Sequence, residues 1–164
     1  MLGLCLTLAL PIQAQAATTN DMTQPMTETV TSEFSDTIGD CIEAMPSLGE
    51  VVMEYASQFE GNRYVYGGTD LENGIDCSGF VMKIYEEFGY SLPHSSSALR
   101  SVGEEVDVDD MQPGDIICFS GHVALYAGDG QMLHASNSKP YPAGGIKYSE
   151  VWYDKIITVR RLTA

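Results

Sequence analysis

Apolar residues recur at helical spacing in two segments of the chain. The first segment opens at Ser47 and is followed by Gly61, and the second starts close to Cys77 and is followed by Gly89. This spacing predicts two amphipathic helices, each ended by a glycine. Their apolar faces consist of Leu48, Val51, Val52, Tyr55 and Phe59 in the first helix and Phe80, Val81, Ile84, Tyr85 and Phe88 in the second.

The hydrophobic period changes after Pro93, from helical spacing to short apolar runs. These runs are separated by turns that contain glycine, and they predict β-strands. The predicted strands cover residues 115–120, 122–127, 131–136 and 156–162. Helices therefore come first and an antiparallel sheet second, which predicts an α+β fold.

The first residues of the chain have the features of an export signal. Residues 1–16 combine a short apolar run with Ala14-Gln15-Ala16, the small residues that a signal peptidase requires, so we expect a signal peptide and a secreted protein. The run is too short to span a bilayer, which needs about 20 apolar residues. Because no Lys or Arg precedes Arg63, we expect the natural start to lie upstream of Met1.

The rest of the chain suits one domain. Residues 17–46 are rich in Thr, Ser, Asp, Glu and Met, which predicts a disordered spacer and leaves residues 47–164 as the folded domain. The formal net charge is −15, from 8 Lys and Arg against 23 Asp and Glu. Such a surface repels phosphate groups, so nucleic acid is excluded as a partner and we expect a freely diffusing monomer.

Cys77 stands at the predicted start of the second helix, within Asp76-Cys77-Ser78-Gly79. Unpaired backbone N–H groups and the helix dipole at such a position favour the thiolate form of a cysteine, which attacks carbonyl carbons. The same N–H groups can hold the oxyanion that this attack produces. Alternatively, Cys77 is a buried core thiol on the apolar face of the helix, the usual setting of a free cysteine.

A catalytic thiol needs an imidazole that accepts its proton and a third group that orients this imidazole. Of the three histidines, His122 and His134 lie on neighbouring predicted strands joined by Gly128-Asp129-Gly130. A three-residue loop with a left-handed final glycine places Ala124 opposite His134 and both imidazoles on one face of the sheet. A two-residue turn shifts the register by one and puts the histidines on opposite faces.

Other roles remain open for several of these side chains. His134 could instead be a strand-end histidine bonded to backbone, and His94, in a Ser-rich loop, is expected at the rim of a site. Cys118 lies in an apolar predicted strand and is expected to be structural, whereas Cys41 lies in the spacer and could pair outside the chain. Because no CxxC spacing accompanies the histidines, we expect neither a metal site nor a cofactor.

Six short motifs mark the predicted domain: Tyr64-Val65-Tyr66-Gly67-Gly68, Asp76-Cys77-Ser78-Gly79-Phe80-Val81, Leu92-Pro93, Gln112-Pro113-Gly114-Asp115, Gly121-His122-Val123-Ala124-Leu125-Tyr126 and Met132-Leu133-His134-Ala135. In this order they resemble NlpC-type cell-wall peptidases, over about residues 47–161. That family is similar to a reduced papain core, with a cysteine at a helix start packed against a sheet that carries a histidine and a polar third residue. The resemblance therefore implies a papain-like α+β fold.

The resemblance also implies roles for the matching residues. Cys77 matches the family nucleophile, His122 the general base and later acid, and His134 the group that orients this base. Together these three residues argue against a domain that only binds.

Three further residues match substrate positions of the family. Tyr64 matches a tyrosine whose hydroxyl faces the catalytic thiol. Asp76 and Ser78 match positions that hold the free amino end of the substrate in relatives that cut stem peptides, a task that suits an acidic side chain. The rim departs from the family pattern, because Arg63, Tyr66 and His94 replace the usual proline, tryptophan and arginine.

The activity implied by the resemblance is that of a secreted cysteine endopeptidase acting on peptidoglycan stem peptides. We expect it to cut after D-glutamate, as a γ-D-glutamyl endopeptidase does. Two alternatives stay open. One is a cysteine N-acetylmuramoyl-L-alanine amidase, which uses the same Cys and His machinery, and the other is a catalytically silent wall-binding domain of the same fold.

Overall fold

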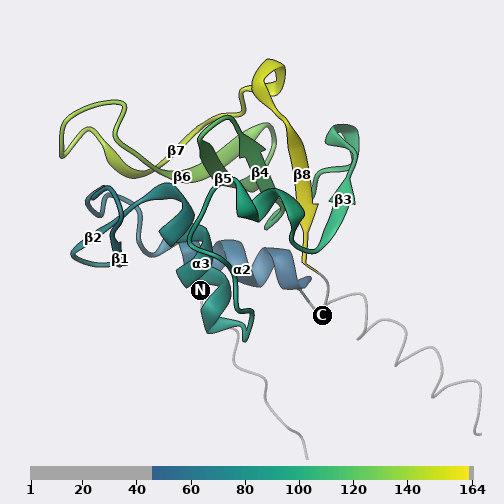
Figure 1. Cartoon of the computed structure of the whole chain (residues 1–164), viewed down its shortest axis with the longest axis horizontal. Coiled ribbons are helices and arrows are strands. Elements are labelled where there is room, and N and C mark those ends of the chain that lie inside the picture. Colours follow the sequence, from purple (N-terminus) through teal and green to yellow (C-terminus); the bar gives the residue numbers. More distant parts are fainter. Residues whose placement is uncertain (1–45, 163–164) are drawn as a thin grey trace, which may run out of the picture. The chain divides into compact units, whose positions relative to one another are not determined.

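The structure is a computed structural model that describes residues 46–162 of the chain. Figure 1 shows two helices on one side of a twisted antiparallel sheet. The predicted signal peptide and residues 17–45 of the predicted spacer lie outside the described residues. Within the described part, no helix is both long and apolar enough to cross a membrane.

Two helices form where the apolar spacing predicts them. Helix α2 spans Leu48–Ser57 and begins with a capping box, in which Ser47 and Glu50 each accept the backbone N–H of the other through their side chains. Helix α3 spans Cys77–Glu87 and is capped by Asp76, whose carboxylate accepts a backbone N–H of the first turn. The cap of α3 fixes where the chain leaves its extended conformation, and Cys77 is the first residue beyond it.

Six strands form one antiparallel sheet in the order β3-β8-β4-β5-β6-β7. Four of them match the predicted strands: β4 (Ile116–Phe119), β5 (His122–Gly128), β6 (Gln131–Ser136) and β8 (Thr158–Arg161). The hydrophobic pattern does not predict the two edge strands, β3 (Glu104–Val106) and β7 (Gly145–Glu150), because most of their residues are not buried. A separate hairpin joins β1 (Thr69–Asp70) to β2 (Gly74–Ile75) just before α3.

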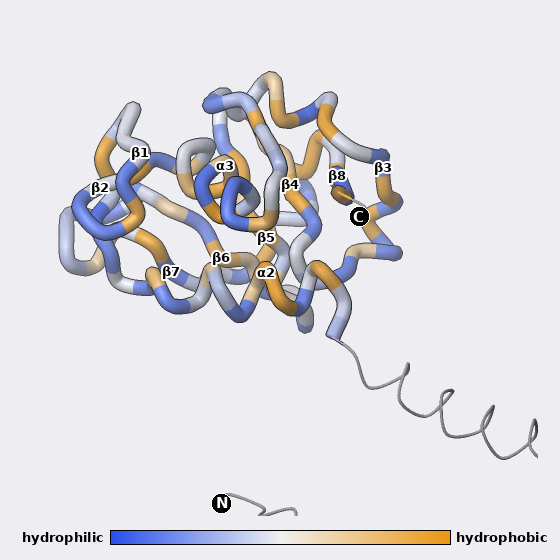
Figure 2. The backbone as a smooth tube through the Cα atoms, turned by 90° about the horizontal axis from the view of Figure 1, so that it is seen from below, coloured by the Kyte–Doolittle hydropathy of each residue, from blue (hydrophilic) through white to orange (hydrophobic). Residues whose placement is uncertain are grey.

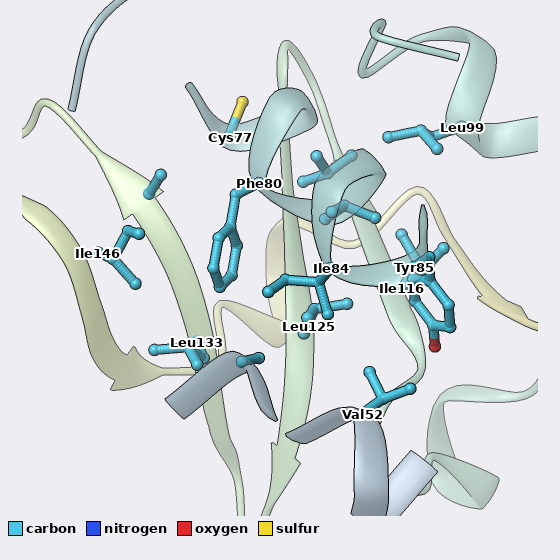
Figure 3. Packing of buried hydrophobic residues seen from close by; sticks show 14 of the residues in the cluster. Val52, Cys77, Phe80, Ile84, Tyr85, Leu99, Ile116, Leu125, Leu133 and Ile146 are labelled. Carbon is cyan, nitrogen blue, oxygen red and sulfur yellow. The ribbon is translucent and has the colours of Figure 1, made fainter. Parts of the chain in front are cut away.

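The main core lies between α3 and strands β5 and β6 (Figure 3). Phe80 and Ile84 of α3 are fully buried there with Leu125 of β5 and Leu133 of β6. Burying a side chain of this size stabilises the fold by roughly 2 kcal/mol. Figure 2 shows hydrophobic segments in the central strands, whereas the β1–β2 hairpin is mostly hydrophilic. This packing fixes the first turn of α3 against the sheet.

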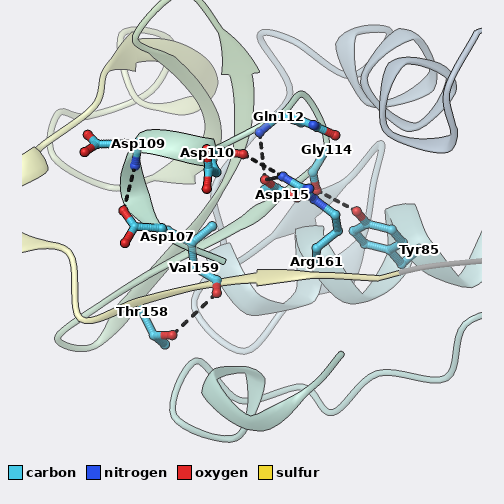
Figure 4. A network of polar contacts seen from close by, with 10 residues as sticks. All are labelled: Tyr85, Asp107, Asp109, Asp110, Gln112, Gly114, Asp115, Thr158, Val159 and Arg161. Carbon is cyan, nitrogen blue, oxygen red and sulfur yellow. Dashed lines mark hydrogen bonds and ion pairs between the residues drawn. The ribbon is translucent and has the colours of Figure 1, made fainter. Parts of the chain in front are cut away.

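A polar network ties the last strand to the loop before β4 (Figure 4). The Arg161 guanidinium donates two hydrogen bonds of 2.7 Å to the carboxylate of Asp115, which is 2% exposed. The Tyr85 hydroxyl donates to the Gly114 carbonyl. Gly114 and Asp115, which belong to the Gln112–Asp115 motif, thus have a structural role. The neighbouring pocket of about 200 Å³ contains no candidate site residue.

The connection between β5 and β6 is a two-residue turn, the second of the two loop lengths that the sequence left open. Gly128 pairs with Gln131 across the turn. Asp129 and Gly130 between them have φ of 50° and 72°, which are the left-handed values of a tight hairpin turn. A turn of this length would by itself place the two candidate histidines on opposite faces of the sheet.

A β-bulge in β5 compensates for the short turn. The pairing shifts by one residue at Ala127, and beyond the shift Leu125 pairs with Leu133. The extra residue restores the register that the longer loop would have given. His122 and His134 therefore lie on one face of the sheet, as predicted, but because of the bulge.

Candidate active site

Cys77 is the first residue of α3, so the helix cap sets its position. Asp76 precedes it in an extended conformation and accepts the Gly79 N–H at 2.7 Å. Figure 3 shows the Cys77 side chain at the start of the helix, beside the main core. The residue is 8% exposed. The thiol thus lies at a helix N-terminus, as predicted, and is also largely buried.

The surroundings of the thiol favour its protonated form. Burial raises the pKa of Cys77 above its usual value, and the negative charge of Asp76 acts in the same direction. Backbone N–H groups, among them that of Val123, act against this rise. The helix terminus predicts a stabilised thiolate, but burial outweighs its effect. The contact with the Val123 N–H also places the sulfur against the second residue of β5, the neighbour of His122 in the chain.

The two candidate histidines are joined by a hydrogen bond of 2.7 Å between His122 Nε2 and His134 Nδ1. The Nε2 atom of His134 lies 3.0 Å from the Ser149 hydroxyl on β7. When this hydroxyl accepts the Nε2–H of His134, the Nδ1 atom of His134 can accept from His122. His122 then carries its hydrogen on Nε2, and its Nδ1 atom is free to accept a proton.

Aromatic rings enclose the histidine pair. The ring of Trp152 lies 5.8 Å from that of His122 and 5.6 Å from that of His134, and Phe119 stacks on His122. Burial lowers the pKa of His122 to about 4. Burial and the charges of His122 and Lys147 lower the pKa of His134 to about 3. Both imidazoles are therefore neutral at neutral pH, the form in which His122 accepts a proton.

Tyr64 lies beside the thiol. Its backbone forms an isolated bridge with Ile75, two residues before Cys77. Burial raises the pKa of the Tyr64 hydroxyl, and the nearby Cys77 and Asp76 raise it further. The hydroxyl is therefore protonated at neutral pH and can donate a hydrogen bond to an oxygen held near the sulfur.

The Asp76 carboxylate is buried and has several hydrogen-bond donors. Its Oδ1 atom accepts from the Gly79 N–H and the Ser78 hydroxyl, and its Oδ2 atom accepts from the Gly67 N–H. His94 Nε2 lies 2.8 Å from Oδ1, which places His94 at this edge of the site. Burial raises the pKa of Asp76, but these hydrogen bonds lower it on balance, so the carboxylate is ionised at neutral pH.

The sequence did not point to Ser149 or Trp152. Ser149 belongs to β7, whose outer residues are too polar to predict a strand, so its register with His134 could not be inferred. Trp152 is the single tryptophan of the chain, which is a weak signal, but only the fold brings it to the histidines.

The protonated resting thiol leads to a prediction about its reactivity. We expect the rate of Cys77 alkylation by iodoacetamide to keep rising with pH through and above 9, because the pKa of the thiol is raised. The rate of a Cys77→Ser variant, measured in parallel, gives the contribution of the other cysteines. A plateau that begins near pH 6 would instead show a thiolate paired with a protonated His122.

The fold and the candidate site define a papain-like α+β domain, as predicted. The NlpC/P60 family model matches residues 61–161 of the chain. The solved NlpC/p60 domain of the peptidoglycan hydrolase SagA resembles the structure with a TM-score of 0.60 and 28% identity, over 71% of this chain and 100% of that chain. The chain therefore belongs to the NlpC/P60 family of bacterial cell-wall endopeptidases.

Two curated relatives are similar to this chain in sequence. A probable endopeptidase of Mycobacterium tuberculosis (strain ATCC 25618 / H37Rv) is 42% identical over 88 residues, which cover 52% of this chain and 23% of that protein. The gamma-DL-glutamyl hydrolase of Bacillus subtilis (strain 168) is 32% identical over 124 residues, which cover 70% of this chain and 30% of that protein. The matched part of the chain thus corresponds to less than a third of either relative's length.

Proposed function

We propose that this domain is a cysteine peptidase that hydrolyses peptidoglycan stem peptides outside the cytoplasm. Cys77 is the nucleophile, His122 the general base and later the acid, and His134 the residue that orients His122. The observation that carries this proposal is the hydrogen bond of 2.7 Å between His122 and His134. The Cys77 sulfur contacts the backbone N–H of Val123, the residue that follows His122 on β5. A binding domain needs no oriented imidazole beside a thiol.

The proposed reaction starts from a neutral thiol and a neutral imidazole. As the Cys77 sulfur attacks the scissile carbonyl carbon, its proton passes to His122 Nδ1 and the carbonyl oxygen becomes an oxyanion. The Cys77 backbone N–H at the start of α3 and the Tyr64 hydroxyl are the donors for this oxyanion. When the carbon–nitrogen bond breaks, His122 gives its proton to the leaving amine.

Water completes the cycle. It attacks the acyl-enzyme carbonyl while His122 Nδ1 accepts one of its protons. The carbon–sulfur bond then breaks, the carboxylic acid product leaves, and the proton returns to the Cys77 sulfur. His134 stays bonded to His122 Nε2 throughout, which keeps the imidazole from turning away and stabilises its charged form.

The bond we propose is the γ-D-glutamyl bond to the diamino acid of the stem. The similarity to the gamma-DL-glutamyl hydrolase of Bacillus subtilis, at 32% identity, supports this choice. The ionised Asp76 with the Ser78 hydroxyl supports recognition of a free amino end. Oδ1 of Asp76 already takes several donors, whereas Oδ2 takes one from Gly67 N–H and retains capacity for an ammonium group.

Blocking that amine tests the proposed specificity. We expect N-acetylation of a stem that begins with L-alanine to lower kcat/KM by about tenfold or more, because the charge that faces Asp76 is lost. The measurement is the initial rate on paired blocked and free stems, with product masses. Equal rates on the two stems would instead favour the amidase, whose substrate has this nitrogen in an amide bond, or a cutter of cross-bridges.

A further inference from the structure

We propose that a pocket between Tyr64 and the β6–β7 loop binds a free carboxylate of the stem peptide through Lys139. The proposal rests on the peptidase function proposed above and adds a substrate group that this site selects. The pocket has a volume of about 340 Å³. It is lined by Tyr64 and by Asn137, Ser138, Lys139, Pro140, Tyr141 and Gly144 of the loop.

The pocket adjoins both halves of the candidate active site. Tyr64 forms one wall, and its hydroxyl is close enough to Cys77 for the thiol to raise the pKa of this hydroxyl. On the opposite side, Ser138 accepts a hydrogen bond of 2.9 Å from the Lys147 ammonium, whose charge also acts on His134. A group bound in this pocket therefore lies next to a substrate carbonyl held at the thiol.

The loop that forms the pocket is fixed at several points. Its first turn is held by the Ser136 hydroxyl, which donates to the Ser138 hydroxyl at 3.1 Å. Its far side is held by Tyr141, whose ring lies under the Arg63 guanidinium at 5.6 Å. Arg63 stands where the family usually has a proline. Its contact with Tyr141 gives this replacement a role in shaping the pocket.

Positive charge is concentrated here in a chain with a net charge of −15. Lys83, Arg160 and Arg161 have carboxylate partners elsewhere in the fold. Lys139 belongs to the loop, and the Lys147 ammonium donates to Ser138 of the same loop. Among residues 46–162, no carboxylate lies within ion-pair distance of either lysine. An acidic surface repels an anionic ligand except where such uncompensated cations lie together.

The stem peptide supplies a matching group. A γ-linked glutamate uses its side-chain carboxyl in the peptide bond, so its α-carboxylate stays free close to the scissile carbonyl. The Lys139 ammonium can pair with this carboxylate, and the Asn137 amide and the Ser138 hydroxyl offer further donors. Amidation of the carboxylate removes its charge while keeping nearly the same shape, so the pocket is expected to distinguish the acid from the amide.

Three synthetic stems with free amino ends test this inference. One has both its glutamate α-carboxylate and its terminal diamino acid carboxylate free, and the other two each have one of these groups amidated. We expect amidation of the glutamate to raise KM of the wild type by about tenfold, with a smaller change in kcat. Lys139→Ala should raise KM for the free stem by a similar factor and abolish the difference between the acid and the amide.

Lys83→Ala is the matched control, because it removes the same charge from the outer surface of α3, where Lys83 pairs with Glu86. This variant should keep the preference for the acid. If the terminal carboxylate shows the Lys139-dependent effect instead, the pocket binds that carboxylate and the inference still holds. Equal KM for all three stems, or a preference that survives in Lys139→Ala, would overturn it.

The inference and the peptidase proposal fail in different ways. Binding of the three stems to the Cys77→Ala variant measures carboxylate selection without any turnover. Hydrolysis that does not depend on Cys77 would remove the proposed mechanism, whereas binding that ignores the carboxylate and Lys139 would remove only the pocket.

Discussion

Replacing Cys77 by alanine is expected to reduce stem-peptide hydrolysis to the uncatalysed background, because the sulfur is the atom that attacks the scissile carbonyl in the proposed mechanism. The substitution removes only the sulfur of a side chain at the edge of the core, so the free energy of unfolding should fall by about 1 kcal/mol or less. The measurement combines product release with a thermal melt of each purified protein.

Cys118→Ala is the control for this substitution. Cys118 is fully buried in β4, and burial raises the pKa of its thiol to about 11, so it is a structural residue without a reactive thiolate. This variant should melt at a lower temperature and keep its turnover per folded molecule. Hydrolysis that persists in Cys77→Ala at a temperature where the protein is folded would rule out Cys77 as the nucleophile.

Replacing His134 by alanine is expected to lower kcat by about 10² with a smaller change in KM, because His122 loses the acceptor that orients it. Asparagine offers an amide oxygen near the place of His134 Nδ1, and glutamine offers one on a longer side chain. Both variants should retain more activity than alanine. Ser149→Ala removes only the outer hydrogen bond and should cost about fivefold in kcat, the equivalent of one neutral hydrogen bond.

Stability must be measured with these variants, because His134 does not line an open cleft. It is 1% exposed and lies against Trp152, so the alanine variant should also melt at a lower temperature. Turnover per folded molecule therefore separates the two roles of this residue. An alanine variant with unchanged kcat would make His134 a structural residue only.

The loss of folding stability at acidic pH follows from the burial of His122. Burial lowers the pKa of His122 to about 4. In the folded protein this imidazole therefore stays neutral at pH values near 6.5, where an exposed histidine becomes protonated. Its protonation in the unfolded chain begins at higher pH than in the folded one, so folding stability is lost as the pH falls from about 6.5 towards 4.

The helices and the central strands could be predicted from the sequence because their apolar positions follow one period. Phe80, Ile84 and Leu125 occupy the core that their spacing implies. The location of Cys77 at a helix start also follows from local signals, since Asp76 is a good helix cap. These features depend on residues that are close together in the chain.

The remaining features depend on compensation between distant residues. The histidine register results from a short turn and a bulge at Ala127, and neither could be inferred from the pattern of β5 and β6 alone. Ser149 reaches His134 only because the polar edge strand β7 pairs with β6. The raised pKa of the Cys77 thiol depends on how deeply α3 packs, which its sequence position does not determine.

The most direct test of the proposed function is the mass of the products formed from purified peptidoglycan fragments with free amino ends. The account predicts two products in equal amounts, the dipeptide of L-alanine and D-glutamate and a fragment that begins with the diamino acid. Their formation should stop in the Cys77→Ala variant. Cleavage of another bond of the stem, or no product from the folded wild-type protein, would contradict the account.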